Sequence, residues 1–229
     1  MVSTMCTSKS TYSNTDYTLK LDVLNRGVSG YNSNNLLYVL PEVLAAEHVP
    51  GKSEIKLLTI FIGTNDALDT IQAVPLDKFR ANIRAMTSMA LAKGIQVILI
   101  GPTLHDQVAN KKVSQDGIIA SSAKNRKYSQ AVELVAHELN VPFIDLWSAF
   151  VREGGWPEEN ILDNSVSCEE FLPDGIHFSP TAYRVLYDEI INCINRNYPE
   201  LKLEALQRKL RGWRDVDRDN IQRLVFRLD

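Results

Sequence analysis

The hydrophobic pattern of the chain alternates between short apolar runs and longer amphipathic segments. Nearly continuous β-branched and aromatic positions over 54–63 and 95–101 predict two strands that are covered on both faces. Shorter apolar runs over 19–25 and 141–147 predict two further strands. Because helical segments separate these runs, we expect a mostly parallel sheet with helices on both faces.

The segments between the predicted strands have the spacing of amphipathic helices. Apolar positions recur at helical intervals over 34–48, 75–94, about 118–139 and 180–197. Pro75 and Pro180 suit the first turn of a helix, and Gly94 suits a position just after the last turn. The loop between 101 and 118 is polar and predicts no element.

The ends of the chain differ in character from this alternating middle. Residues 1–16 are rich in Ser and Thr and predict a flexible, polar N-terminus. Residues 17–229 show no internal repeat and no clear boundary, so we expect a single domain. From about residue 200 the chain mixes charges and predicts a helical tail with a solvated face.

Composition excludes several classes of partner. The 25 basic and 28 acidic residues give a net charge of −3, which offers no electrostatic reason to bind nucleic acid. No apolar run reaches the roughly 18 residues that a membrane helix needs. The N-terminus lacks the apolar core of a secretory signal, so we expect a cytoplasmic protein without a membrane partner. The sequence does not indicate an oligomeric state.

The distribution of Cys, His and Gly argues against a metal or cofactor. Three cysteines, Cys6, Cys168 and Cys193, lack metal-ligand spacing and predict free thiols in a reducing compartment. The four histidines are scattered, and the chain has neither of the glycine-rich phosphate-binding motifs. We therefore expect no metal and no cofactor.

Three loops carry residues that could perform chemistry, and two of them directly follow predicted strands. They span 25–32, 63–66 and 174–180. In parallel α/β sheets the functional site lies beyond the carboxyl ends of the strands. Each loop alone has an ordinary structural explanation: a glycine turn, a helix N-cap at Asn65, or a turn at Asp174 beside a half-buried histidine.

Taken together, the three loops indicate acyl transfer. Asp174 precedes His177 by three residues, a spacing that lets the carboxylate hold the imidazole as a general base. The side chain of Asn65 and the backbone N–H of Gly30 could then donate to developing negative charge on an ester oxygen.

The same motifs resemble the GDSL, or SGNH, hydrolases. The segments LDVLNRGVSGYNS, IFIGTNDA and DGIHFSPTAY are similar to those of the isoamyl acetate-hydrolysing esterase group within that family. The resemblance implies a three-layer α/β/α sandwich with a flavodoxin-like sheet and cofactor-free hydrolysis of short-chain carboxylic esters by a Ser-His-Asp mechanism. It also implies that His177 is the base, Asp174 its partner, and Asn65 and Gly30 the oxyanion donors, with Gly101 and Pro102 lining the cleft.

The chain departs from this family at the nucleophile. Family members begin with a buried strand that ends in Gly-Asp-Ser, and this sequence contains no such motif. The nucleophile is therefore unknown, with Ser3 as the nearest candidate ahead of Cys6, Ser8 and Ser10. We expect the first, central strand to be missing, so that the core has a gap, or the two flanking strands pair directly or stay under-covered. Each of these outcomes predicts lowered stability.

Three hypotheses follow from this departure. The first is an N-terminally incomplete version of a working esterase. The second is a catalytically inactive homologue that acts as a binding or scaffold protein. The third is an active chain with an unusual nucleophile such as Ser3. In the first and third, the only partner that we expect is a small-molecule ester substrate.

Overall fold

The sheet is parallel throughout, and its strand order is β2-β1-β3-β4-β5. The computed structural model describes residues 2–5, 17, 20–113, 120–208, 214 and 216–221. The strands are β1 (Val2–Met5), β2 (Val23–Asn25), β3 (Leu57–Phe61), β4 (Gln96–Ile100) and β5 (Phe143–Ile144). In this order the carboxyl ends of β2, β1 and β3 lie beside one another, which brings the loops that follow β2 and β3 to one edge of the sheet.

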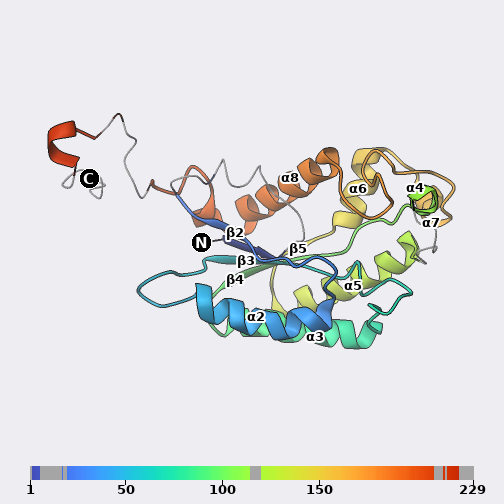
Figure 1. Cartoon of the computed structure of the whole chain (residues 1–229), viewed down its shortest axis with the longest axis horizontal. Coiled ribbons are helices and arrows are strands. Elements are labelled where there is room, and N and C mark those ends of the chain that lie inside the picture. Colours follow the sequence, from blue (N-terminus) through green and yellow to red (C-terminus); the bar gives the residue numbers. More distant parts are fainter. Residues whose placement is uncertain are drawn as a thin grey trace.

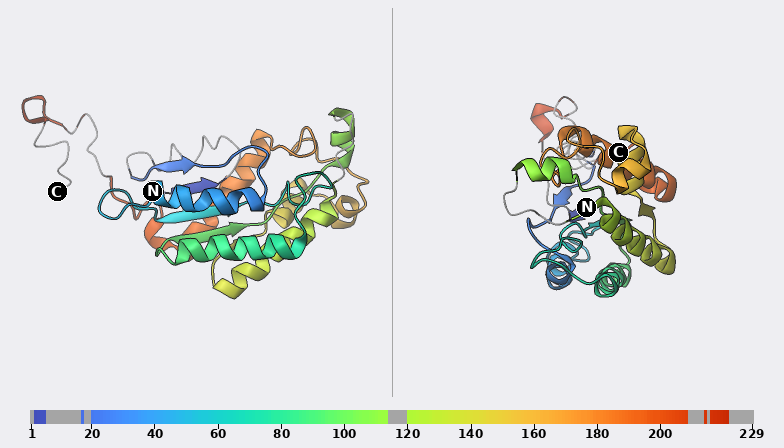
Figure 2. Two further views of the ribbon diagram at one scale, coloured as in Figure 1. Left: turned by 60° about the horizontal axis from the view of Figure 1, so that its bottom comes forward. Right: turned by 90° about the vertical axis from the view of Figure 1, so that its right-hand side faces the viewer.

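Helices cover both faces of this sheet, as Figures 1 and 2 show. The helices are α2 (Ser33–Glu47), α3 (Leu76–Leu91), α4 (Gln107–Val113), α5 (Ser122–Leu139), α6 (Leu146–Gly154), α7 (Glu158–Leu162) and α8 (Pro180–Asn197). In Figure 1, α2, α3 and α5 lie on one side of the sheet, and α6 and α8 lie on the other. The predicted α/β/α sandwich is confirmed.

Each layer of helices has its own hydrophobic core. Because successive strand residues point to opposite faces, β3 sends Leu58 and Ile60 toward α2 and α3, whereas it sends Leu57 toward α6 and α8. All three of these side chains are at most 1% exposed. Burial on both faces explains why β3 is apolar at every position except Thr59, which is itself buried.

The centre of the sheet corrects one expectation. We expected the position between β2 and β3 to be vacant, but Val2–Met5 occupies it as β1. Ser3 lies opposite Leu24 on one side and Leu58 on the other. Without β1, backbone N–H and C=O groups of both neighbours would lack partners, and burying such groups is costly. Of the segment 1–16 that we predicted to be flexible, residues 1 and 6–16 lie outside the described residues.

The strand predicted over 141–147 is shorter than expected, because a helix begins inside it. The carboxylate of Asp145 accepts a hydrogen bond from Ser148 N at 3.1 Å and so caps α6. The sequence interpretation also missed α4 and α7, which are only 7 and 5 residues long. Too few turns are present in such helices to produce a clear apolar period.

The predicted helical tail from about residue 200 is not found in the described part of the chain. Pro199–Leu201 and Arg218–Asn220 form short 3₁₀ helices, and 202–208 contains turns and irregular chain. Residues 209–213, 215 and 222–229 lie outside the description. The end of α8 is instead held by the hydroxyl of Tyr198, which donates to Val97 O at 2.9 Å.

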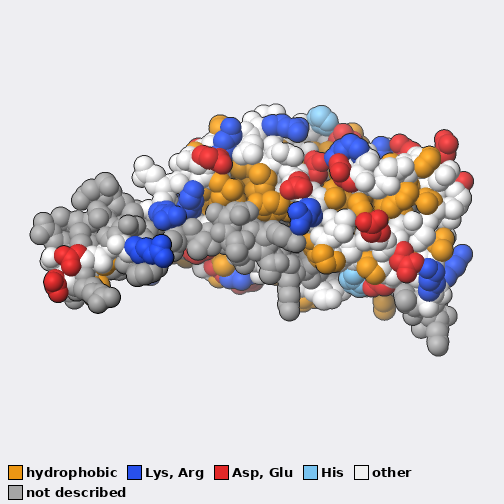
Figure 3. All heavy atoms as spheres, turned by 90° about the horizontal axis from the view of Figure 1, so that it is seen from above, with side chains coloured by type: hydrophobic (Ala, Val, Ile, Leu, Met, Phe, Trp, Pro, Cys, Tyr) orange, Lys and Arg blue, Asp and Glu red, His pale blue; other side chains and the backbone are white. Residues whose placement is uncertain are grey.

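The surface above α6 and α8 carries acidic and basic groups interspersed with apolar patches, as Figure 3 shows. Among the described helices, none is both long and apolar enough for a bilayer crossing. Cys168 and Cys193 are free thiols, as predicted, and both are buried. Burial raises the pKa of the Cys168 thiol to about 12, so this cysteine stays protonated and is a poor nucleophile at neutral pH.

A buried histidine lies in the loop between β4 and α4. His105 is 2% exposed, and its backbone N–H and C=O both bond to the hydroxyl of Ser122, at 3.1 and 3.0 Å. Burial lowers the pKa of His105 to about 4, although the carboxylates of Asp106 and Asp174 act to raise it. His105 is therefore neutral at pH 7.

The first prediction concerns the central strand. Replacing Ser3 by Pro removes a backbone N–H from a strand that pairs on both sides, so we expect the free energy of unfolding to fall by about 1–3 kcal/mol. Ser3→Ala keeps the N–H and is the matched control. Urea unfolding of both variants measures the difference, and equal midpoints would contradict the placement of β1.

The second prediction concerns pH. An unfolded histidine binds a proton near pH 6.5, whereas folded His105 binds one only near pH 4, so the unfolded state holds more protons in between. The contribution of His105 to the free energy of unfolding should therefore fall by about 2 kcal/mol as the pH is lowered from 7 to 5. Urea unfolding at both pH values should show this loss in the wild type and in His137→Gln, which alters an exposed histidine. A His105→Gln variant with the same loss would contradict the assignment.

Candidate active site

The loop after β3 brings Asn65 and Asp66 to the carboxyl edge of the sheet. The turn begins at Gly63, which has a φ of +129° and lies so close to Phe79 that a Cβ there would be 3.0 Å from the ring. Glycine is therefore required for both conformation and space. This local requirement explains why a glycine stands between the buried strand and the polar pair.

Asp66 fastens this loop to the start of α2. Both of its carboxylate oxygens accept from Ser33 N, at 3.0 and 3.1 Å, and Asp66 and Ser33 are fully buried. Burial raises the pKa of Asp66, and the hydrogen bonds from Ser33 partly offset that rise. A carboxylate at a helix N-terminus also interacts favourably with the helix dipole. Asp66 therefore shapes the site rather than facing it.

Asn65 reaches the neighbouring loop as well. Its Nδ2 donates to Tyr31 O at 2.8 Å, next to Gly30 in the loop after β2. Because a side-chain amide carries two hydrogens, one remains for a ligand. The predicted donors Asn65 and Gly30 are thus held side by side by a direct contact between their loops.

The turn at 174–177 holds the predicted acid–base pair. Nδ1 of His177 lies 2.6 Å from Oδ2 of Asp174, and Oδ1 of Asp174 accepts from the backbone N–H groups of His177 and Ile176, at 2.8 and 3.0 Å. Partial burial acts to raise the pKa of Asp174, but these hydrogen bonds together lower it. The carboxylate is therefore ionised at neutral pH, and Nε2 is the ring nitrogen left for a substrate.

The loop after β4 and the helix α4 both support this turn. Asp106 N donates to Gly175 O at 3.0 Å, and Nδ2 of Asn110 donates to Asp174 O at 3.0 Å. Gly175 has a φ of +86°, and a Cβ there would lie 2.3 Å from Asp106 O. Glycine is therefore needed after Asp174, because the backbone at Asp106 lies too close to position 175 for a side chain.

One cavity joins these parts. It has a volume of about 300 Å³ and includes Gly30, Asn65 and His177 in its wall. Asp174 lies behind His177 and orients the ring. The other residues that line the cavity are Ser29, Tyr31, Phe61, Ile62, Gly63, Thr64, Leu68, Gln72, Ile176, Phe178 and Tyr183. All four predicted catalytic and oxyanion residues therefore meet at one place.

Other predicted positions lie elsewhere. The backbone of Ser3 sits in the middle of β1 opposite Leu58, rather than at the carboxyl end of the strand. Cys6, Ser8 and Ser10 lie outside the described residues. Gly101 and Pro102 are buried and do not line the cavity.

The contacts of Gln72, Asp106 and Asn110 were missed by sequence reasoning. Asp106 and Asn110 follow a strand, so their position alone could have drawn attention to them. Nothing in the local sequence distinguishes Gln72, because its contact with Gly30 spans 42 positions.

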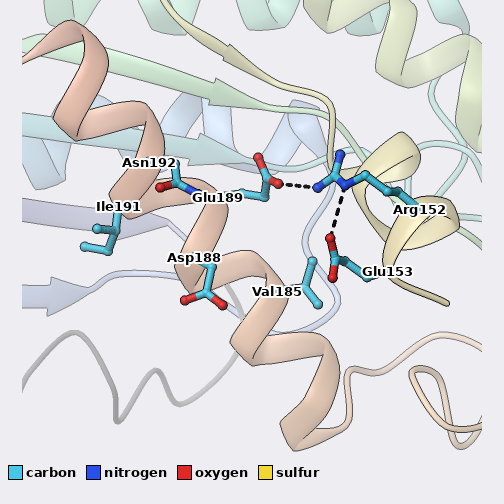
Figure 4. A pocket seen from close by; sticks show the side chains of 7 residues that line it. All are labelled: Arg152, Glu153, Val185, Asp188, Glu189, Ile191 and Asn192. Atoms are coloured by element: carbon cyan, nitrogen blue, oxygen red, sulfur yellow. Dashed lines mark hydrogen bonds and ion pairs between the residues drawn. The ribbon is translucent and has the colours of Figure 1, made fainter. Parts of the chain in front are cut away.

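A second hollow lies between α6 and α8, as Figure 4 shows. It measures about 400 Å³. Arg152 of α6 reaches across it to Glu189 of α8 and also pairs with its neighbour Glu153. The side chain of Arg152 is 59% exposed, and exposed ion pairs of this kind contribute little to stability. The residues that line the hollow include no histidine and no hydroxyl or thiol group, which favours the first cavity as the active site.

Comparison with known proteins identifies the family of the chain. The family model described as GDSL-like Lipase/Acylhydrolase matches residues 11–185. The isoamyl acetate-hydrolyzing esterase of Saccharomyces cerevisiae is 38% identical over 208 residues, which cover 88% of this chain and 80% of that protein. A human isoamyl acetate-hydrolyzing esterase 1 homolog is 30% identical over 212 residues, covering 86% and 76%.

Solved structures show the same fold. A lipase/acylhydrolase from Enterococcus faecalis superposes with a TM-score of 0.58 and 26% identity, over 82% of this chain and 79% of that one. A variant of an acetyl-xylooligosaccharide esterase from Geobacillus stearothermophilus superposes with a TM-score of 0.57 and 20% identity, over 75% of this chain and 71% of that one. At that identity the likeness supports the fold alone. From the family match and the relatives together, the chain belongs to the GDSL-like lipase/acylhydrolase family.

Proposed function

We propose that the chain hydrolyses short-chain carboxylic esters and that His177 is the general base. The observation that carries this proposal is the convergence of His177, Asn65 and Gly30 on one cavity, with Asp174 bonded to the far side of the imidazole. An oriented base and two donors are the groups that acyl transfer needs. The names of the esterase relatives support the same reaction class.

The proposed steps use this geometry directly. Nε2 of His177 accepts the proton of a hydroxyl nucleophile while the oxygen of that hydroxyl forms a bond to the ester carbonyl carbon. The carbonyl oxygen gains negative charge, which Asn65 Nδ2 and Gly30 N–H stabilise by donating hydrogen bonds. When the C–O bond to the alcohol breaks, protonated His177 returns the proton to the leaving oxygen, while Asp174 stabilises the charged imidazole. If the nucleophile is a hydroxyl of the chain, a water activated by His177 then attacks the acyl carbon, and the carboxylic acid leaves as the proton returns to that hydroxyl.

The size and lining of the cavity support small esters as substrates. At about 300 Å³ the cavity lies at the lower end of the range for ligand pockets. Phe61, Leu68 and Phe178 supply apolar wall on which an alkyl group can pack. The yeast relative is named for hydrolysis of isoamyl acetate, an ester of this size class.

The source of the nucleophilic oxygen is a separate part of the proposal. In parallel α/β sheets the reacting groups follow the strands, and Ser3 lies within β1. The segment that directly follows β1 lies outside the described residues. A water molecule activated by His177 would give slower hydrolysis without a covalent intermediate.

The third prediction tests the base. With p-nitrophenyl acetate, His177→Gln should lower the hydrolysis rate at least about 100-fold, because general-base catalysis commonly contributes that much. Asp174→Asn should also lower it, because the amide cannot stabilise a charged imidazole. His137→Gln, on the exposed face of α5, is the matched control. Equal rates for His177→Gln and the control would refute the assignment of His177 as the base.

A different outcome would favour a binding protein: the wild type binds the ester but does not hydrolyse it.

The fourth prediction tests Ser3. Because Ser3 lies in the middle of β1, we expect Ser3→Ala to keep the wild-type rate of p-nitrophenyl acetate hydrolysis and the wild-type level of labelling by a fluorophosphonate. Mass spectrometry of the labelled peptide identifies any serine that reacts. Loss of both hydrolysis and labelling in Ser3→Ala would show that Ser3 is the nucleophile and that β1 shifts in the active state.

A further inference from the structure

Gln72 belongs to the loop that connects β3 to α3 and lines the cavity from that side. The loop is held firmly at its end, because Val74 N donates to Asp66 O at 3.1 Å and the hydroxyl of Tyr128 donates to Val74 O at 2.6 Å. The adjacent Ile71 is fully exposed and does not line the cavity. Of these two neighbours in the anchored loop, Gln72 therefore faces the cavity and Ile71 faces solvent.

Two hydrogen bonds join Gln72 to the loop after β2. The side-chain Nε2 of Gln72 donates to Gly30 O at 2.6 Å. The backbone carbonyl oxygen of Gln72 accepts from Nδ2 of Asn32 at 2.8 Å. Asn32 is also the N-cap of α2, so the second bond ties Gln72 to the start of that helix. The two contacts bracket the backbone from Gly30 to Asn32.

Gly30 needs such an external restraint. Its φ is +77°, and a glycine has no side chain to limit rotation about its backbone bonds. Within its own loop the nearest support is Tyr31 N, which donates to Val28 O over a long 3.3 Å. The bond from Gln72 is shorter and comes from a different, anchored loop.

We propose that Gln72 is a positioning residue, which fixes the Gly30 carbonyl and thereby holds the Gly30 N–H in place as an oxyanion donor. The inference rests on the proposed ester hydrolysis for its catalytic consequence. A donor that is already oriented needs no reorganisation as charge develops, so loosening Gly30 should weaken transition-state binding more than substrate binding. Gln72 acts through Gly30 and takes no proton itself.

Two variants and one control test this role. Gln72→Ala removes the side chain, whereas Gln72→Glu keeps its shape but replaces the donor with a carboxylate that repels the Gly30 carbonyl. Ile71→Ala changes the exposed neighbour. With p-nitrophenyl acetate, both Gln72 variants should lower kcat about three- to tenfold with KM within about twofold, the effect of losing one hydrogen bond. Ile71→Ala should match the wild type.

A second measurement does not depend on turnover. In ¹H–¹⁵N NMR spectra, the Gly30 amide should shift and exchange its hydrogen faster in both Gln72 variants, and it should keep its wild-type behaviour in Ile71→Ala. An unchanged Gly30 amide overturns the inference. So does a shifted Gly30 amide with unchanged kcat in an active enzyme.

The two measurements also separate this inference from the proposed function. If the wild type does not hydrolyse the ester, the proposed function fails, and the Gly30 amide alone decides whether Gln72 holds that backbone. If the wild type is active and His177→Gln is not, a normal kcat in both Gln72 variants rejects the inference and leaves the proposed function intact.

Discussion

The buried contact between Asp66 and Ser33 is the interaction on which the site depends. It joins the loop after β3 to the first turn of α2, with both partners removed from water. A carboxylate is buried at high cost unless it is hydrogen-bonded, so the two loops are stable only in the arrangement that completes these bonds. Because this contact anchors the loop after β3, Asn65 and Gln72 of that loop are held in place to bond to Tyr31 and Gly30.

The turn that carries Asp174 and His177 is supported independently of this contact. It is bonded to Asp106 in the loop after β4 and to Asn110 in α4. The donors and the base therefore belong to different structural units, which the parallel sheet places along one edge. This separation suits the proposed reaction, in which Gly30 and Asn65 donate to the carbonyl oxygen while His177 takes the proton of the attacking hydroxyl.

The sequence was sufficient to predict the layers, the long helices and the meeting of Gly30, Asn65, Asp174 and His177. Strong periodicity marks β3, β4, α3 and α8, and the topology of parallel sheets then brings their loops together. The elements α4 and α7 were missed because they have too few turns to show an apolar period, and α6 was missed because its start is set by the Asp145 cap inside a predicted strand.

The central strand was the main error. Val2–Met5 has only four residues, and its place in the sheet depends on pairing with β2 and β3, which no local pattern reveals. Gln72 was missed for a similar reason, since its role arises from a contact between distant loops. Interactions of this kind depend on tertiary structure, whereas hydrophobic periodicity reports only local structure.

The convergence of the oxyanion donors and the base on one cavity is tested most directly by a crystal structure with a short-chain alkyl phosphonate, a tetrahedral mimic of the reacting ester. We expect one phosphonate oxygen to lie about 2.7–3.1 Å from both Gly30 N and Asn65 Nδ2, with His177 Nε2 beside a second oxygen. A phosphonate bound in the hollow between α6 and α8, or bound in the cavity without contact to these donors, would contradict the account.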